Sequence, residues 1–514
     1  MVSTTMTEDV FRKLIARRAQ TLLGIVRYIS QCRLDTEILM RPLMGELLSQ
    51  STQIEELLDA YGAGNCCQWC GLRSLVAALK HFSDASYELL HIRHSLPAYC
   101  LLHIERDFTK ATDQTLVFTA NVLRRTANQT LKKADQLELT IPTQSFREKS
   151  YTEELPEGRL PFHCKTRRIE TVAETVTLLT TAFLNLAAES ASVRAASRAK
   201  PQEYASYVRN SVSEEKLRNL ELRFHNLQSL YDTYVSGTEA ARLDPDLPVL
   251  RGHISVVFHL LRTAVLFVHH YERHVNKQPC DSSLREERLV EAEELLDVLM
   301  NYTVTHISLY IACAENLCHE MLKRYAEVGS IEVPVPPYRG FHVRPSTLIS
   351  QLVRHYGSKI QMELDGSVYD AGSPLELFRA NEKINAQKRR WLASEIVRLS
   401  LVQELNGRAK NIEDVVRHIV LRLAGNSKLI LYEQPLQVPE TLADKEGTLI
   451  EKVVDVMAQL LATGKIDAES NLEARFVGDK RVLFDIKLLA ESGYGEDNFG
   501  NNIPLPEKLS YLRR

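Results

Sequence analysis

Apolar residues recur every three or four positions through most of residues 1–329, and this period constrains the fold more strongly than any other feature. It is the spacing of side chains along one face of an α-helix. The pattern is visible at Ile54–Leu58 and Leu72–Leu79, and again over 169–188, 205–235, 253–276 and 286–328. Strand signals are sparse here, so residues 1–329 are predicted to form an all-α region of long, bundle-like helices.

One stretch interrupts this helical region. Residues 142–167 contain Pro156, Gly158 and Pro161 among charged residues, which predicts a loop or linker and a subdivision of the helical region. The chain has 514 residues, of which 44% are hydrophobic and 25% charged, enough for about three globular domains. The formal net charge of −3 gives no overall field that would favour nucleic acid or an acidic membrane.

The apolar segments are expected to belong to a soluble chain. The closest approach to a spanning helix, residues 254–268, is interrupted by His259 and Arg262, and we expect no membrane insertion. The N-terminus lacks the apolar run and cleavage site of a secretory signal, which favours a cytoplasmic location. The basic helix predicted over residues 10–30 is best explained as the first packed helix, with its arginines facing solvent.

A second region is organised around the stretch Arg339–Pro345. Gly340 permits a tight turn, and Pro345 suits the first turn of a helix because it has no N–H to lose. Gly357 can end that helix. The sequence therefore places His342 near the N-cap of a short amphipathic helix, with Ser346 and Thr347 in its first turn; its apolar face comprises Leu348, Ile349, Leu352, Val353 and Tyr356.

Strand signals flank this helix. Residues 331–335 are β-prone, and two alternating runs at 360–364 and 368–370 are joined by Asp365-Gly366, a strong hairpin signal. Ser373 then begins a capping box that predicts a second helix from Pro374. The predicted order is strand, histidine, helix, strand, strand, helix.

This order and its histidine motif resemble HPr, the histidine-containing phosphocarrier protein family of the bacterial phosphoenolpyruvate-dependent sugar phosphotransferase system. The family motif Gly-aliphatic-His-small-Arg-Pro matches Gly340, Phe341, His342, Val343, Arg344 and Pro345. Ser373 lies 373 − 342 = 31 residues beyond the histidine, as the regulatory serine of HPr does. The resemblance implies an open-faced α/β sandwich, phosphorylation of His342 at Nδ1, and a protein phosphoryl donor or acceptor of the phosphotransferase type as partner.

Elementary chemistry supports the same role for the motif. A neutral imidazole offers a lone pair for attack on a phosphoryl group. The resulting anion would lie at the positive end of a helix, where the Arg344 guanidinium can bind its oxygens. The alternative for His342 is a loop histidine that merely caps a helix, and the alternative for Ser373 is a capping residue without a regulatory role.

The sequence departs from the family in three places. Val343 replaces a small residue, and its β-branch is expected to crowd the histidine. The second helix continues to Asn406-Gly407, which is longer than in the family. The fourth strand is missing from its usual position, and a candidate at 428–432 follows only after another helical run over 412–424. The HPr-like unit is thus either enlarged by an insertion or rebuilt at one edge.

The remaining residues predict a small C-terminal segment. A helix is expected over 449–461, followed by a hairpin of 474–477 with 480–484 and by a loop or flexible arm over 493–506. The predicted fold is therefore α+β and multidomain. It comprises the all-α region 1–329, an HPr-like domain 330–435 with an extended second helix, and a small α/β segment 436–514.

Two clusters invite a metal-binding interpretation. Cys67 and Cys70 form a single Cys-x-x-Cys without a second pair, so reduced and structural thiols are expected. His270 and His274 lie four residues apart on one helical face and supply two ligands at most; Glu315 and His319 have the same spacing. We therefore predict no metal and no cofactor.

Two functions remain open at this stage. One is a phosphocarrier or phosphorylation-responsive regulatory protein that accepts a phosphoryl group on His342. The other is a non-phosphorylated HPr-like scaffold whose helical region binds a partner protein. We find no nucleotide-binding glycine loop, nucleophile elbow or kinase motif set, so whether the chain is an enzyme stays open. A homo-oligomer is compatible with the sequence.

Overall fold

The computed structural model of this chain describes residues 6–143, 172–275, 289–398, 400, 412–432, 435–438, 448–469 and 471–512. The chain divides into two compact units, Met1–Met321 and Leu322–Arg514. The predicted fold class is confirmed, because the N-terminal region is 72% helix and the C-terminal part is mixed α/β with small antiparallel sheets. Most of the predicted linker at 142–167 lies outside the described residues.

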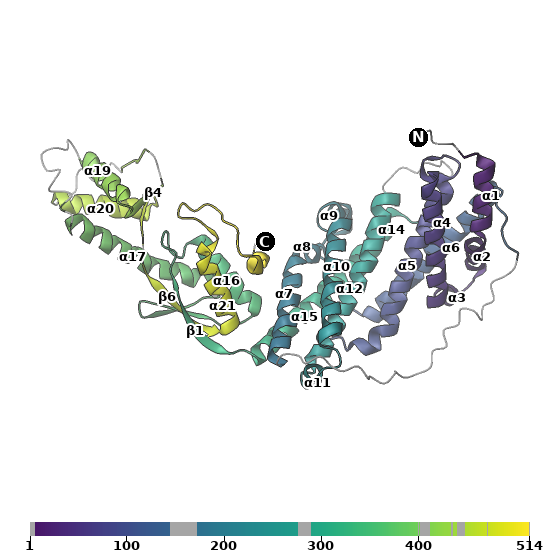
Figure 1. Cartoon of the computed structure of the whole chain (residues 1–514), viewed down its shortest axis with the longest axis horizontal. Helices are drawn as coiled ribbons and strands as arrows, with labels where there is room; N and C mark the ends of the chain where they lie inside the picture. Colours follow the sequence, from purple (N-terminus) through teal and green to yellow (C-terminus); the bar gives the residue numbers. More distant parts are fainter. Residues whose placement is uncertain are drawn as a thin grey trace. The chain divides into compact units, whose positions relative to one another are not determined.

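The N-terminal unit consists of helices packed side by side (Figure 1). Its longer members are α4 (Arg41–Ala60), α5 (Cys70–Tyr99), α6 (Phe108–Gln136), α7 (Val172–Glu189), α10 (Glu214–Tyr234), α12 (Asp246–His270) and α15 (Thr305–Arg324). Shorter helices are α1 (Glu8–Arg18), α2 (Gln20–Gln31), α3 (Asp35–Ile38), α8 (Ala191–Ala196), α9 (Tyr204–Asn210), α11 (Glu239–Leu243) and α14 (Ala292–Asp297).

Helix α5 lies at the centre of this unit. It packs against α4, α6 and α12, while α12 also packs against α10. The apolar positions that predicted α5, including Leu75 and Leu79, are fully buried against these neighbours. Burial of such a stripe is what stabilises a helix that would be marginal alone in water.

Helix α12 is longer and more apolar than we expected. It continues without a break into a π-helical turn, Tyr271–Val275, and the 30 residues Asp246–Val275 are long and apolar enough to cross a membrane. This corrects the expectation that no segment reaches that length. However, 78% of its most apolar window is buried inside the unit, as is usual for the core helix of a bundle.

The C-terminal unit is built on a four-stranded antiparallel sheet in the order β1-β6-β2-β3. The strands are β1 (Val328–Pro334), β2 (Gln361–Leu364), β3 (Ser367–Asp370) and β6 (Glu473–Asp479). One row across the sheet, Ile331, Phe476, Met362 and Tyr369, faces inward, and the next row, Glu332, Arg475, Glu363 and Val368, faces outward. Alternating side chains thus give the sheet one covered and one open face.

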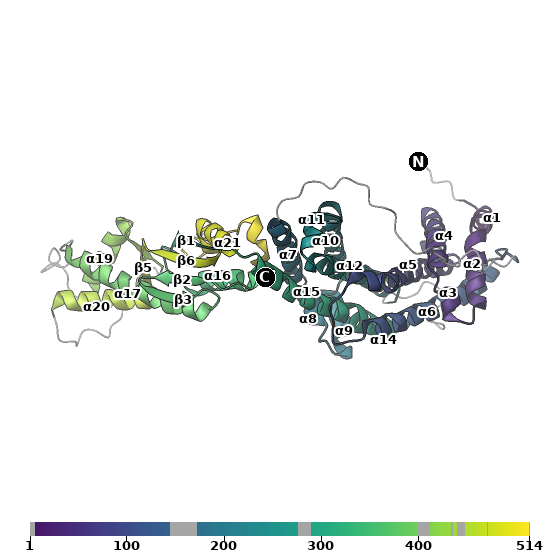
Figure 2. The same cartoon turned by 90° about the horizontal axis from the view of Figure 1, so that it is seen from below.

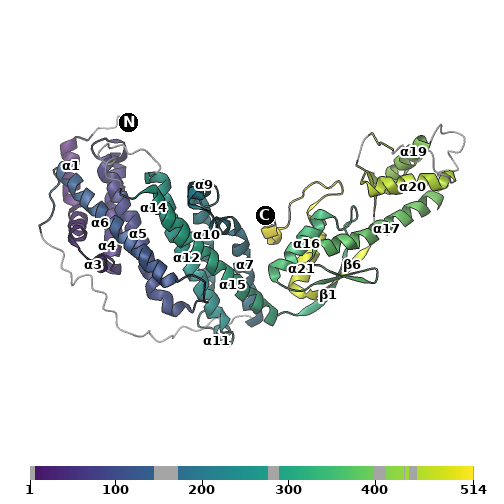
Figure 3. The same ribbon diagram turned by 180° about the vertical axis from the view of Figure 1, so that it is seen from behind.

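Three helices accompany this sheet. They are α16 (Val343–Tyr356), α17 (Pro374–Arg398) and α21 (Lys480–Glu491). Helix α21 packs on β1 and β6 and lies beside α16 (Figures 1 and 3). Helix α17 is confirmed through Arg398. Its predicted unbroken continuation to Asn406-Gly407 is wrong at Ser400, which is in a turn with a φ of +51°; residues 401–411 lie outside the described residues.

The predicted C-terminal hairpin is wrong. Residues 480–484 form the start of helix α21, and strand β6 pairs instead with β1 and β2. The Asp479 side chain accepts a hydrogen bond from the Arg481 N–H at 3.0 Å and so caps the helix. Val482, Leu483 and Ile486 then face the core at helical spacing.

The segment between α17 and β6 forms a lobe of its own. It contains α19 (Ile412–Gly425), β4 (Leu429–Leu431), α20 (Leu449–Ala462) and β5 (Ile466–Ala468), and Figure 2 shows the lobe at the far end of α17. Leu392 and Ile396 of α17 join the core of this lobe. The proposed fourth strand at 428–432 therefore pairs with β5 and not with the main sheet. The main sheet takes its fourth strand from β6, which lies beyond residue 435.

Candidate functional site

The loop before α16 is held by one buried aromatic residue. Phe341 is fully buried and makes edge-to-face contacts with Phe476 of β6 and Tyr494, at centroid distances of 6.5 and 6.2 Å. Gly340 has a φ of +56°, and a Cβ there would lie 2.1 Å from Asn381 Oδ1. Glycine is therefore required at this position for two reasons: the backbone has a positive φ, and the Asn381 side chain leaves no room for a Cβ. This anchoring leaves the next residue, His342, at the mouth of the helix.

His342 is the N-cap residue of α16, as predicted, and 23% of its side chain is exposed. Its Nε2 atom lies 3.1 Å from Oε2 of Glu496, and its Nδ1 atom lies 3.2 Å from the Gly340 carbonyl oxygen. Both ring nitrogens therefore face oxygen acceptors. A neutral imidazole has one N–H, so only a ring protonated on both nitrogens donates to both oxygens at once.

Arg344 binds the same carboxylate. Its Nη1 atom lies 3.2 Å from Glu496 Oε2 and also donates to the Gly500 carbonyl oxygen at 3.3 Å. Glu496 is only 8% exposed, so this carboxylate is largely withdrawn from water. The structure thus brings the two predicted phosphate-binding residues together around one anion.

Glu496 reaches the site because the segment after α21 is an ordered loop. Tyr494 is 2% exposed and its hydroxyl donates to the Pro334 carbonyl oxygen at 2.6 Å, which ties the loop to the end of β1. Asp497 then accepts hydrogen bonds from the N–H groups of Phe499 and Asn501 at 2.9 and 2.8 Å. Of the two alternatives for residues 493–506, the structure supports the ordered loop.

The other predicted site residues support the start of the helix. Pro345 and Ser346 are buried, and the Ser346 hydroxyl donates to the Phe341 carbonyl oxygen at 2.8 Å. The Thr347 hydroxyl donates to the Val343 carbonyl oxygen at 2.6 Å. Val343 itself is 68% exposed, so its β-branch projects into solvent and is not packed into the site.

Ser373 lies at a different helix terminus. Its hydroxyl accepts a hydrogen bond from the Glu376 N–H at 3.4 Å, at the start of α17. This is the geometry of a capping serine. Its regulatory role stays a prediction.

A buried ion pair lies next to the loop that precedes α16. Lys388 of α17 lies 3.0 Å from both carboxylate oxygens of Asp467 in β5, and the side chains are 2% and 8% exposed. Asp467 also accepts a hydrogen bond from the Arg339 N–H, and the Arg339 guanidinium lies 4.2 Å from the ring centre of Tyr432. The lobe between α17 and β6 therefore contacts Arg339, the residue that precedes Gly340, through Asp467 and Tyr432.

Neither Glu496 nor Asp467 was predicted from the sequence. Glu496 contacts His342 across 154 residues and Asp467 contacts Arg339 across 128. No local pattern marks such partners, because each is placed by a strand or loop that joins the sheet from far along the chain.

No family model, curated protein or solved structure matches this chain. The inference of function therefore rests on the residues of the site and on their geometry.

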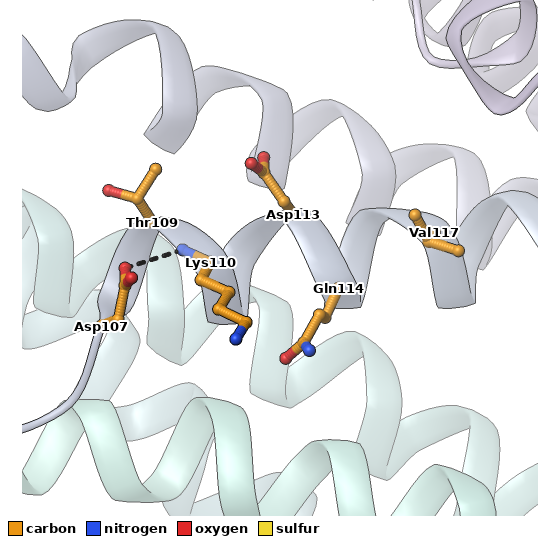
Figure 4. A pocket seen from close by; sticks show the side chains of 6 residues that line it. All are labelled: Asp107, Thr109, Lys110, Asp113, Gln114 and Val117. Atoms are coloured by element: carbon orange, nitrogen blue, oxygen red, sulfur yellow. Dashed lines mark hydrogen bonds between the residues drawn. The ribbon is translucent and has the colours of Figure 1, made fainter.

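A hollow lies elsewhere, in the N-terminal unit. It has a volume of about 490 Å³ and follows one exposed side of α6 (Figure 4). Asp107 at its end caps the helix by accepting a hydrogen bond from the Lys110 N–H at 3.0 Å. Its lining side chains come from α6 and from the N-cap residue Asp107, and they include no nucleophile paired with a base, so the hollow offers no catalytic arrangement.

The cysteine and histidine clusters differ from prediction in one respect each. Cys66 and Cys67 are exposed free thiols, but Cys70 is disulfide-bonded, which corrects the expectation of reduced cysteines at that position.

Glu315 is ion-paired with Arg194 at 2.6 Å. His274 lies near His269 and near His81 of α5, so the cluster contains three imidazoles and not two ligands at most.

Proposed function

We propose that the C-terminal unit is an HPr-like phosphoryl acceptor in which His342 carries the phosphoryl group and Glu496 occupies its place when the group is absent. The observation behind this proposal is that His342 and Arg344 bind one carboxylate at the N-terminus of α16. The site therefore already binds an oxyanion. A phosphoryl group offers three oxygens to the same donors, and an Arg guanidinium can bind two of them.

The position on the helix favours an anion further. The first amides of an α-helix have no partner within the helix, and the helix dipole is positive at that end. His342 is the N-cap residue, so a group on its ring lies beside this end. Glu496 is held at this end of the helix by His342 and Arg344 in the present structure.

The transfer step requires Glu496 to leave. The Gly340 carbonyl oxygen accepts a hydrogen bond from the His342 backbone N–H at 2.9 Å and also faces Nδ1 at 3.2 Å, so that side of the ring is held by backbone. When the Glu496 side chain swings away, Nε2 is uncovered, and any proton on it passes to that carboxylate or to water. The Nε2 lone pair then forms the N–P bond. The bond from phosphorus to the donor protein's phosphohistidine breaks, and its electron pair returns to that ring.

The geometry and the family resemblance differ on the nitrogen. The resemblance implies Nδ1, whereas the ring orientation here favours Nε2, because a side chain moves aside more readily than a backbone carbonyl. Nitrogen-15 spectroscopy of the phosphorylated protein distinguishes the two isomers. We commit to Nε2.

Charge repulsion makes Glu496 and the phosphoryl group mutually exclusive. Two unit charges 4 Å apart repel by about 4 kcal/mol at an effective dielectric constant of 20. A phosphoryl group carries about −1.5 to −2 charges at pH 7. The carboxylate must therefore withdraw, and the loop around Tyr494 and Asp497 is released or rearranged with it. Phosphorylation of this unit would act as a charge switch on its C-terminal loop.

A second candidate function is supported by the same contact. A site whose histidine is already engaged on both nitrogens suits an HPr-like scaffold that carries no phosphate and binds a partner protein through its helical unit. In that case Glu496 is a permanent structural partner of His342 and Arg344. Labelling separates the two functions.

The experiment incubates the purified full-length protein with the general phosphotransferase enzyme and labelled phosphoenolpyruvate. Acid-labile label is expected on the wild type and is expected to disappear in His342→Ala. Arg344→Ala is expected to reduce labelling at least tenfold, because the oxyanion loses its guanidinium partner.

The matched control is His355→Gln on the same helix. His355 stacks on Tyr511 at a centroid distance of 4.3 Å, away from the motif, so this variant should label like the wild type. If no phosphotransferase donor labels the wild type while circular dichroism shows an intact fold, the phosphoryl-acceptor function is abandoned in favour of the scaffold.

A further inference from the structure

The N-terminal unit gathers three histidines that the sequence does not place together. His81 comes from the middle of α5, whereas His269 and His274 come from the end of α12 and the π-helical turn that continues it. One ligand nitrogen from each lies within 4.8 Å of the other two. The His81 ring lies 4.7 Å from that of His269 and 5.3 Å from that of His274, measured between centroids.

The π-helical turn explains why these two histidines share a face. Residues 269 and 274 are five apart, which places them well apart around an α-helix but stacks them in a π-helix with its i to i+5 bonds. The sequence-based pairing of His270 with His274 assumed an ordinary α-helix. Tyr271–Val275 is π-helical instead, so the residue that shares the cluster with His274 and His81 is His269.

We propose that His81, His269 and His274 bind a divalent transition-metal ion of the Zn²⁺ class through three imidazole nitrogens. Three histidines with a fourth position open to water or another ligand form a common zinc site. Tetrahedral Zn²⁺ with bonds of about 2.0–2.1 Å needs ligand atoms roughly 3.4 Å apart, so the rings must approach each other by at most about 1.5 Å. We expect rotations of the two partly exposed rings, His269 and His274, to provide that approach.

A carboxylate behind one ligand strengthens the assignment. Nδ1 of His269 lies 2.9 Å from Oε1 of Glu214, the first residue of α10. Histidine ligands of metals usually donate their second ring N–H to a carboxylate, which orients the ring and makes the other nitrogen a better ligand. The Glu214 carboxylate therefore lies close enough to His269 to orient its ring once a metal is bound. Glu214 is itself held by Arg218, whose Nε lies 2.8 Å from its Oε1.

His81 is the most buried member of the cluster. His81 is 6% exposed, and its Nδ1 is buried without a hydrogen-bond partner among the described residues. A buried ring nitrogen without a partner calls for an explanation, and a bound metal ion would supply one. His270 packs on Phe82 and on His274, and it closes the apolar side of the cluster.

The test is zinc binding by the full-length protein after treatment with a chelator. Titration against a chromophoric zinc chelator should show one site per chain that is lost in His269→Gln/His274→Gln. Co²⁺ should give the visible absorption bands of a tetrahedral site in the wild type and not in this double variant. Glu214→Gln should weaken zinc binding tenfold or more, because it removes the carboxylate behind the ligand.

The control is His94→Gln, an exposed histidine on α5 outside the cluster, which should bind zinc like the wild type. The double variant retains Cys66 and Cys67, so binding at these exposed thiols cannot account for a difference. Helix content by circular dichroism, measured without metal, must match between variants. Absence of a zinc site in the wild type, or equal affinity in the double variant, overturns the proposal.

Discussion

The buried pair Lys388–Asp467 permits a quantitative prediction for the unit that carries the site. Lys388 is 2% exposed and lies 3.0 Å from each oxygen of Asp467, which is 8% exposed. Burial lowers the pKa of Lys388, and the attraction of Asp467 offsets only part of that effect. Lys388→Met removes the cation but leaves a carboxylate buried without its counter-ion.

The expected cost is about 3–5 kcal/mol in the free energy of unfolding, the usual range for breaking one partner of a buried ion pair. Adding Asp467→Asn to this variant removes the stranded charge. Asparagine keeps a side-chain oxygen for the Arg339 N–H, which donates to Asp467 in the wild type. The double variant should therefore recover more than half of the loss.

Trp391 on α17 provides the assay. The chain has two tryptophans, and Trp69 lies in the other unit, so urea unfolding of a Trp69→Phe background followed by fluorescence reports the C-terminal unit. Arg389→Met, an exposed cation next to Lys388, is the control and should change stability by less than about 0.5 kcal/mol. A loss below 1 kcal/mol for Lys388→Met, or no recovery in the double variant, would refute the reasoning.

Three further predictions concern the two units. Glu496→Gln should raise the rate of phosphoryl acceptance by His342 at least fivefold, because it removes the competing charge; an unchanged or lower rate in the labelling assay would contradict the proposed competition. Gly340→Ala should cost about 1–3 kcal/mol, since its φ is +56° and its Cβ would meet the Asn381 amide; an unchanged unfolding midpoint argues against this. Burial, with the neighbouring His259, lowers the pKa of His91 to about 4. Between pH 6.5 and 4 the unfolded chain therefore binds more protons than the folded chain. The contribution of His91 to stability is complete above pH 6.5 and is lost as the pH falls through this window. Melting temperatures should therefore decline from pH 7 to 4, and the decline should be less steep in His91→Gln.

Local patterns predicted helices and strands well where one face of the element is buried and the other is exposed to solvent. The stripe that includes Ile349, Leu352 and Val353 predicted α16, and the Asp365-Gly366 turn predicted the β2–β3 hairpin. Prediction failed at 480–484, where Val482 and Leu483 suit a strand or a helix equally well over so short a run. The capping hydrogen bond at Asp479 and the position of β6 between two other strands decided for the helix.

The candidate site divides in the same way. The loop that presents His342 and the arginine two residues later follow from local chemistry, because a glycine turn, a buried Phe341 and a proline at the first helical turn are consecutive in sequence. Glu496, which completes the candidate site, lies far along the chain from His342. In the proposed zinc site, His81 likewise comes from a different helix than His269 and His274.

By itself, the sequence determined the helical nature of the first unit, the helix that begins at His342 and the hairpin after it, since each depends on residues within one or two turns of one another. Only the tertiary structure decided that β6 completes the sheet, that Glu496 contacts the histidine and the arginine, and that a π-helical turn brings His274 to His81. The physical reason is that these contacts are made by burying surfaces from distant segments, and the spacing of residues along the chain carries no record of which surfaces will meet.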